Sequence, residues 1–106
     1  MTAAIRILYV DDEPSLLEIC KLFLEENRGF SVDCAISGKE ALDRIAAAKY
    51  DAIVSDYQMP GMDGISLLKK VRAKNKTLPF ILFTGRGREE VVIEALNVGA
   101  DSYLQI

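Results

Sequence analysis

The sequence predicts an α/β fold in which a parallel sheet lies between two layers of helices. Strand-like and helix-like segments alternate along the whole chain, and the connections between them are short. The first, third and fourth strand-like segments are also almost continuously apolar, which is typical of strands buried on both faces. Such an alternation requires right-handed crossovers, and these place helices on both faces of the sheet.

Five segments have the composition of strands. They are residues 5–10, 30–35, 51–56 and 78–84, together with residues 101–104, which begin a fifth strand. In the second segment, apolar and polar side chains alternate from Phe30 to Ala35, as in a strand with one exposed face. We therefore expect the second strand to be half-exposed.

Four helices are predicted between these strands from their start and stop signals. The start signals are Asp11-Asp12-Glu13-Pro14, a capping box of Ser37 and Glu40, Asp63 as a cap, and Glu89-Glu90; Gly29 and Gly99 end the first and fourth helices. The first helix carries an apolar stripe made of Leu16, Leu17, Cys20, Phe23 and Leu24. We expect this stripe to pack on the sheet.

Length and composition exclude several classes of function. A chain of 106 residues with a net charge of −3 is one domain with no general attraction for nucleic acids, and it contains no basic helix pair for direct DNA binding. It has no apolar stretch of the ~20 residues needed to span a membrane, and its start does not resemble a signal peptide, so we expect a cytoplasmic protein. The absence of histidine rules out a histidine phosphodonor. Cys20 and Cys34 lack CxxC spacing and are expected to be buried, reduced thiols.

Three acidic residues and one hydroxyl follow the apolar strands. Asp11 and Asp12 follow the first strand, Asp56 ends the third, and Thr84 ends the fourth before Gly85. Because the carboxyl ends of parallel strands form the ligand-binding edge of such a sheet, we expect these side chains to meet there. Clustered carboxylates repel one another, and a hard cation such as Mg²⁺ relieves the repulsion. A carboxylate can also attack phosphorus and form an acyl phosphate.

Each of these residues also has a purely structural interpretation. Asp12 is a reasonable helix cap, Asp56 a turn-forming acid, and Asp63-Gly64 a turn followed by a cap. Thr84, taken alone, is a strand end. Their combination at one edge of the sheet favours the functional interpretation.

The motifs together resemble those of response regulator receiver domains, the CheY-like family. The matching segments are Val10-Asp11-Asp12-Glu13, Asp56 to Gly64 with Met59-Pro60 and Asp63-Gly64, Thr84-Gly85, and Gly99-Ala100-Asp101 with Tyr103. The resemblance covers residues 1–106 as one domain. It implies a three-layer flavodoxin-like sandwich with strand order 2-1-3-4-5.

The resemblance also implies roles for individual residues. Asp56 would accept a phosphoryl group from a sensor histidine kinase or a phosphotransfer protein. Mg²⁺ or Mn²⁺ would bind to Asp12, to Asp56 and to the backbone carbonyl of Gln58, with Asp11 acting largely through water. Thr84 would contact the phosphoryl oxygens, and Tyr103 would act as the aromatic switch toward a downstream effector. In the loop after the acceptor, Met59-Pro60 adds rigidity and Gly64 permits close packing.

The sequence departs from the family pattern at its end. The family carries a lysine three residues after the switch aromatic, where this chain has Ile106, and the family's last helix is missing, so we expect a C-terminally truncated domain or a true variant. Without that helix, part of the apolar face of the first, third and fifth strands is expected to be bare, which favours marginal stability, self-association or a swapped homodimer.

Three functions therefore compete. The first is a phospho-accepting receiver in two-component phosphorelay signalling, which is not an enzyme beyond catalysing its own phosphorylation and dephosphorylation. The second is a pseudo-receiver that binds proteins independently of phosphate, motivated by Ile106. An aspartate-based phosphatase is disfavoured because Gln58 occupies the position of its second acid.

Overall fold

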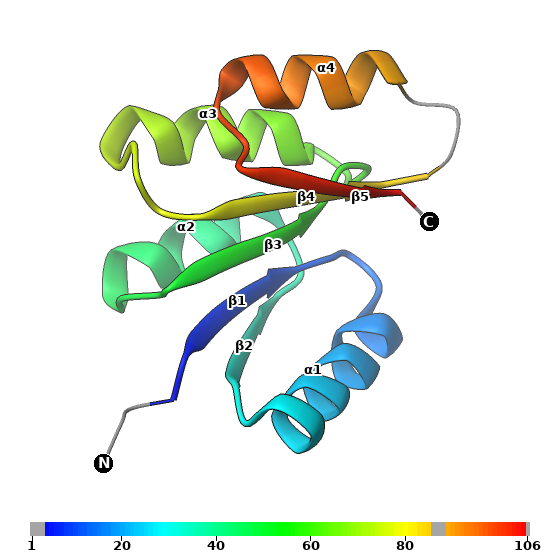
Figure 1. The fold of residues 1–106 in the computed structure, drawn as a ribbon, viewed down its shortest axis with the longest axis vertical. Helices are drawn as coiled ribbons and strands as arrows, with labels where there is room; N and C mark the ends of the chain where they lie inside the picture. The colour runs from blue at the N-terminus through cyan, green and yellow to red at the C-terminus, as the bar shows by residue number, and fades with distance from the viewer. Residues whose placement is uncertain (1–3, 86–88, 106) are drawn as a thin grey trace.

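Strands and helices alternate throughout the protein. The computed structural model describes residues 4–85 and 89–105. Its elements are β1 (Arg6–Val10), α1 (Pro14–Arg28), β2 (Ser31–Ala35), α2 (Gly38–Ala47), β3 (Ala52–Asp56), α3 (Gly64–Lys74), β4 (Phe80–Thr84), α4 (Glu89–Val98) and β5 (Ser102–Gln105) (Figure 1). Every predicted element is present, and the ends of the elements differ from the prediction by one or two residues in most cases.

The five strands form one parallel sheet of order β2-β1-β3-β4-β5. This confirms the predicted order and places β2 at an edge. The registers pair Val10 with Ala35 and Ser55, and Asp56 with Phe83. As a result, the ends of β1 and β3 lie side by side in the centre of the sheet.

The two faces of the sheet have separate apolar cores. On one face, side chains such as Leu8, Ile53 and Leu82 are buried under α2, α3 and α4. On the other, Ile7, Tyr9 and Val32 pack under α1. Figure 1 shows α1 beside β1 and β2, whereas α3 and α4 lie toward β4 and β5. Within the described residues, one face therefore has three helices and the other has one.

Several predicted helix signals are confirmed. The backbone N–H of Glu40 donates to Ser37 Oγ at 3.1 Å, and the N–H of Ser66 donates to Asp63 Oδ1 at 2.8 Å. Gly29 ends α1 in the left-handed conformation with φ of 68°. The interpretation of Asp12 as a helix cap is wrong: the N-cap of α1 is Glu13, whose side chain makes no capping hydrogen bond. Asp12 is thus left without a capping role.

The apolar stripe of α1 is only partly covered. Leu17 is buried, but Phe23 is 56% exposed and Leu16 is exposed as well; Ile19, outside the predicted stripe, is 62% exposed. Together with Leu104 of β5, which is 57% exposed, residues of this stripe line an apolar groove of about 410 Å³. The expected bare face is confirmed at β5. It is wrong for β1, where Tyr9 is buried and its ring centroid lies 5.7 Å from that of Phe83. At β3, Val54 is half-buried.

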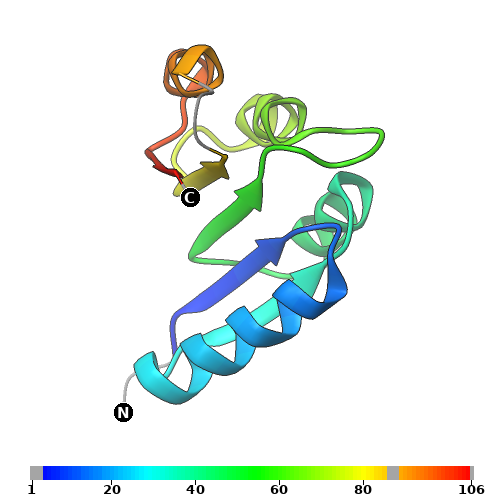
Figure 2. The same cartoon turned by 90° about the vertical axis from the view of Figure 1, so that its right-hand side faces the viewer.

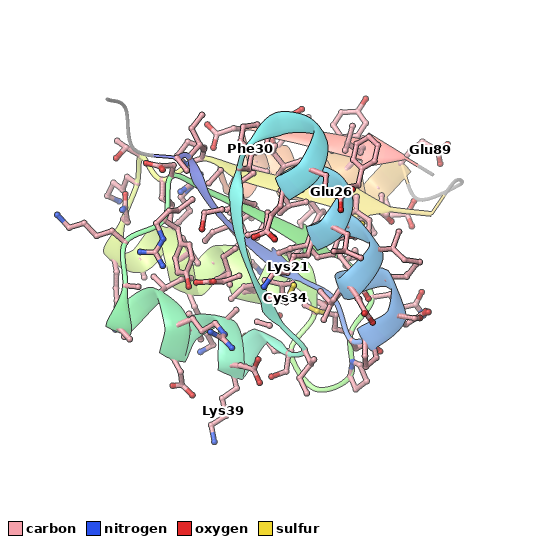
Figure 3. The ribbon with its side chains drawn as sticks, turned by 90° about the horizontal axis from the view of Figure 1, so that it is seen from below. Lys21, Glu26, Phe30, Cys34, Lys39 and Glu89 are labelled. Atoms are coloured by element: carbon pink, nitrogen blue, oxygen red, sulfur yellow. The ribbon has the colours of Figure 1, made fainter. Side chains whose placement is uncertain are left out.

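The two cysteines are free and half-buried. Figure 3 shows Cys34 next to Lys21 in the space between α1 and β2. The thiol of Cys34 donates to the backbone carbonyl of Leu17 at 3.7 Å, and burial raises its pKa despite the nearby ammonium group of Lys21. The thiol is therefore protonated at neutral pH. The expected full burial is wrong, because both cysteines are only half-buried.

Candidate functional site

An open pocket lies at the carboxyl ends of the central strands. It has a volume of about 530 Å³ and is lined by Asp12, Glu13, Asp56, Gln58, Met59, Pro60, Thr84 and Gly85. The β1–α1, β3–α3 and β4–α4 connections all contribute residues, because parallel strands release their connections at the same edge of the sheet. The predicted site residues are thus brought together, with the exceptions described below.

The three acidic residues form a compact cluster. One carboxylate oxygen from each of Asp11, Asp12 and Asp56 lies within 4.8 Å of the others. Asp11 is buried with 1% exposure, whereas Asp12 and Asp56 are half-buried and line the pocket. The cluster therefore consists of one buried carboxylate, that of Asp11, and two carboxylates accessible from the pocket.

Burial changes the proton affinity of Asp56. Desolvation is the largest cause and, together with repulsion from Asp11, raises the pKa of Asp56 to about 6. The backbone N–H groups of Gln58 and Tyr57 oppose this rise by hydrogen-bonding to the carboxylate. Asp56 is therefore mostly ionised at neutral pH, although desolvation and repulsion from Asp11 destabilise its negative charge.

Two buried polar atoms at the site have no partner within the described residues. Asp11 Oδ1 accepts a hydrogen bond from the backbone N–H of Glu13 at 3.0 Å, but Asp11 Oδ2 accepts none. The hydroxyl of Thr84, which is 3% exposed, is also unpaired. A buried polar atom without a partner costs about 1–3 kcal/mol. The two atoms fit a site that receives a cation and a polar group, because Asp11 Oδ2 and the Thr84 hydroxyl would then each have a partner.

Backbone packing holds Asp56 in place. The hydroxyl of Ser55 donates to the carbonyl oxygen of Asp56 at 2.9 Å, and the backbone N–H of Gly64 donates to the carbonyl of Tyr57 at 2.8 Å. A Cβ at position 64 would collide with the carbonyl oxygen of Asp56 and approach Leu82 Cδ1 to 2.6 Å. Only glycine therefore allows the start of α3 to lie this close to the acidic strand end.

The sequence analysis missed two residues of the site. Ser55 is fully buried, and its signal in the sequence is a small hydroxyl side chain in an otherwise apolar strand directly before an acid. Glu13 also lines the pocket; it belongs to the motif that carries the resemblance, but no role at the site was predicted for it.

Other predicted site residues lie at or outside the edge of the pocket. Met59 is buried and Pro60 exposed in the loop that leads to α3. Tyr103 does not line the pocket: it lies on β5, 40% exposed, next to Val92 and Ile93 of α4. Ile106, at the position of the family's lysine, lies outside the described residues.

Comparison with known proteins agrees with this geometry. The family model described as the response regulator receiver domain matches residues 7–105. The chain belongs to this family. Its fold is accordingly the CheY-like one, and receiver domains of this kind act in two-component signalling.

Individual relatives show the extent of the similarity. The response regulator MprA of Mycolicibacterium vanbaalenii is 39% identical over 100 residues, which are 94% of this chain and 43% of that protein. The Francisella response regulator 1452 receiver domain has a TM-score of 0.86 and 41% identity, over 94% of this chain and 82% of that one. The chemotaxis protein CheY4 of Vibrio cholerae has a TM-score of 0.90 and 33% identity, over 97% and 87%.

The receiver domain spans less than half of the length of the curated relatives it matches. None of the helices among the described residues is long and apolar enough to cross a membrane.

Proposed function

We propose that this receiver domain accepts a phosphoryl group on Asp56 from a phosphohistidine of a sensor histidine kinase or phosphotransfer protein. A carboxylate oxygen of Asp56 attacks phosphorus, the P–N bond to the donor histidine breaks, and the histidine nitrogen leaves with the electron pair. The observation that carries this proposal is the position of Asp56, which lies in the open pocket beside two further acids and an unpaired hydroxyl. The domain acts on no diffusible substrate beyond this self-modification.

The protonation state of Asp56 supports a nucleophilic role. With a pKa of about 6, about nine-tenths of the carboxyl groups are ionised at pH 7. The raised pKa also makes the carboxylate more basic than an exposed aspartate. Only the ionised form can attack phosphorus.

The acidic cluster fits Mg²⁺ or Mn²⁺. Asp12 and Asp56 would bind the ion with the backbone carbonyl of Gln58, and the unpaired Oδ2 of Asp11 would act largely through an ordered water. The bound ion supplies positive charge that offsets the repulsion between the acids and the incoming phosphoryl oxygens. Before the ion binds, the three carboxylates of Asp11, Asp12 and Asp56 repel one another.

The output of the domain would depend on Thr84 and Tyr103. The buried hydroxyl of Thr84 would donate to a phosphoryl oxygen and so acquire the partner that it lacks. Thr84 ends β4, and the β4 residue Leu82 pairs with Tyr103 on β5, so a movement of the strand end can reach the exposed aromatic. A downstream effector domain or protein in the cytoplasm would bind to this surface.

A beryllofluoride titration tests this proposal without the partner kinase, because the complex mimics an acyl phosphate. In the presence of Mg²⁺, we expect shifts in the amide NMR signals of residues around Asp56, Thr84 and Tyr103. The Asp56→Asn variant should show none of them. Shifts that persist in this variant, or that do not require Mg²⁺, would contradict the proposal.

A pseudo-receiver is the second candidate. The observation that favours it is Ile106, which has no cation to pair with phosphoryl oxygens where the family has a lysine. Such a domain would bind its partner equally well as wild type and as the Asp56→Asn variant. A phosphoryl mimic would then leave the amide spectrum of the folded protein unchanged.

A further inference from the structure

A further groove lies between α2 and α3, and none of its lining residues lines the acidic pocket. Figure 2 shows these two helices next to each other, with α4 beyond α3. The groove has a volume of about 520 Å³ and is lined by Leu42, Ile45, Ala46, Lys70, Val71, Ala73, Lys74 and Asn75. Its floor is apolar, since Val71 is buried and both Leu42 and Ile45 are half-buried. The small side chains of Ala46 and Ala73 leave its sides open.

The cations of α3 differ in their partners. Those on the side toward α4 and β5 are paired: Lys69 contacts Glu94 of α4 at 3.6 Å, and Arg72 contacts Asp101 at 2.9 Å. Lys70 and Lys74, on the groove side, are exposed and form no ion pair with any described residue. Two unpaired positive charges therefore border an apolar floor in a chain with a net charge of −3.

We propose that the α2–α3 groove binds an acidic amphipathic helix of a partner protein. The apolar side of such a helix would insert one or two aliphatic side chains over Leu42, Ile45 and Val71. Glutamate or aspartate side chains on its flanks would pair with Lys70 and Lys74. Helix-in-groove recognition of this kind combines an apolar seam with charges at its border.

Two features favour a protein helix over other anionic partners. The apolar floor provides no charged contacts for a nucleic acid backbone, because recognition of phosphates depends on many cations in a row. A membrane surface is flat and requires apolar side chains that protrude, whereas here they lie at the bottom of a groove. The groove shares no lining residue with the acidic pocket, so the proposal does not rest on the proposed phosphorylation.

A designed peptide tests the proposal. The probe is a fluorescein-labelled helical peptide of about four turns, with leucine on one face and glutamate on the other. In low salt, we expect its anisotropy to rise on binding, with amide shifts at Ile45, Val71 and Ala73. A matched peptide with lysine in place of glutamate should bind at least about tenfold more weakly.

Matched variants assign the binding to the groove. Lys70→Glu and Lys74→Glu should each weaken the acidic peptide about tenfold, whereas Lys69→Glu, with the same change in net charge on the same helix, should leave its affinity unchanged. Ala46→Leu fills the groove at an exposed helical position, so it should abolish binding while the thermal midpoint stays the same.

Four results would overturn the proposal. The first is an equal loss of affinity for the acidic peptide in Lys69→Glu and Lys70→Glu, and the second is amide shifts on α1 and β5 in place of the groove. The third is equal affinity for the lysine peptide and the acidic peptide. The fourth is binding of anionic vesicles or duplex DNA through Lys70 and Lys74 when the acidic peptide does not bind.

Discussion

Asp56 combines a reactive position with an electrostatic penalty. Its carboxyl group is desolvated and lies beside Asp11, and the pKa rises from 3.8 to about 6. The folded state therefore binds this proton more tightly than the unfolded state does. The contribution of Asp56 to stability falls as the pH rises from about 4 to 6, and the penalty is complete above that window.

Removing the charge of Asp56 should stabilise the protein when no divalent cation is present. We expect Asp56→Asn to raise the free energy of unfolding at pH 8 by on the order of 1–2 kcal/mol, after allowance for partial exposure, and the gain should shrink toward pH 4. Urea unfolding followed by circular dichroism in EDTA measures both effects. Added Mg²⁺ should stabilise the wild type more than the variant. A variant that is less stable than the wild type at pH 8 would show that the acids do not repel one another.

Thr84 should show the same conflict between stability and function. Thr84→Val removes a buried hydroxyl that has no partner among the described residues, so we expect it to raise the free energy of unfolding by about 1 kcal/mol. The same variant should slow phosphorylation by acetyl phosphate, because the incoming oxygens lose a donor. Thr84→Ser, which keeps the hydroxyl, is the control and should retain the rate. If Thr84→Val destabilises the protein, the hydroxyl has a partner in solution.

At the scale of elements, the acidic pocket depends on the close approach of α3 to the end of β3. We expect Gly64→Ala to lower the free energy of unfolding by about 2 kcal/mol or more, because the added methyl group collides with the Asp56 carbonyl and with Leu82. Gly85→Ala is the matched control, since a Cβ there meets no atom of the described residues within 4 Å. Thermal unfolding of both variants makes the comparison. Equal midpoints would mean that the loop after β3 can move away without loss.

Local signals in the sequence predicted the elements well. Ser37 and Asp63 cap their helices as expected, since a cap depends on residues within one turn of it. Strand order followed from the resemblance and is compatible with short right-handed connections. The exposure of Phe23 could not be predicted from its spacing, because periodicity identifies the apolar side of a helix but not how much of it the neighbours cover.

The details of the site were predicted less completely. The carboxylate cluster was predictable, because strand ends of a parallel sheet converge. The hydrogen bond from Ser55 to the Asp56 carbonyl, the unpaired hydroxyl of Thr84 and the raised pKa of Asp56 depend on distances and burial that only the folded chain defines.

At the scale of the whole molecule, the unequal coverage of the sheet exposes an apolar surface. Ile19, Phe23 and Leu104 are each more than half exposed around one groove, and burial of one such side chain is worth about 1.5–3 kcal/mol. We expect the isolated chain to self-associate through this surface as its concentration rises. Light scattering should show a mass that grows with concentration.

A matched pair of variants locates the association. Ile19→Glu should shift the protein toward the monomer, whereas Ile93→Glu should not, although Ile93 on α4 is similarly exposed at 59%. A wild type that stays monomeric at high concentration would contradict the expectation. Equal effects of the two variants would place the contact elsewhere.

Intact-mass measurement after incubation with acetyl phosphate tests the central claim most directly. The account predicts a phosphoryl adduct that requires Mg²⁺, appears in the wild type and is absent from Asp56→Asn. Circular dichroism of the same samples establishes that both proteins are folded. A folded wild type that acquires no adduct, or an adduct that remains in Asp56→Asn, would contradict the assignment of Asp56 as the phosphoryl acceptor.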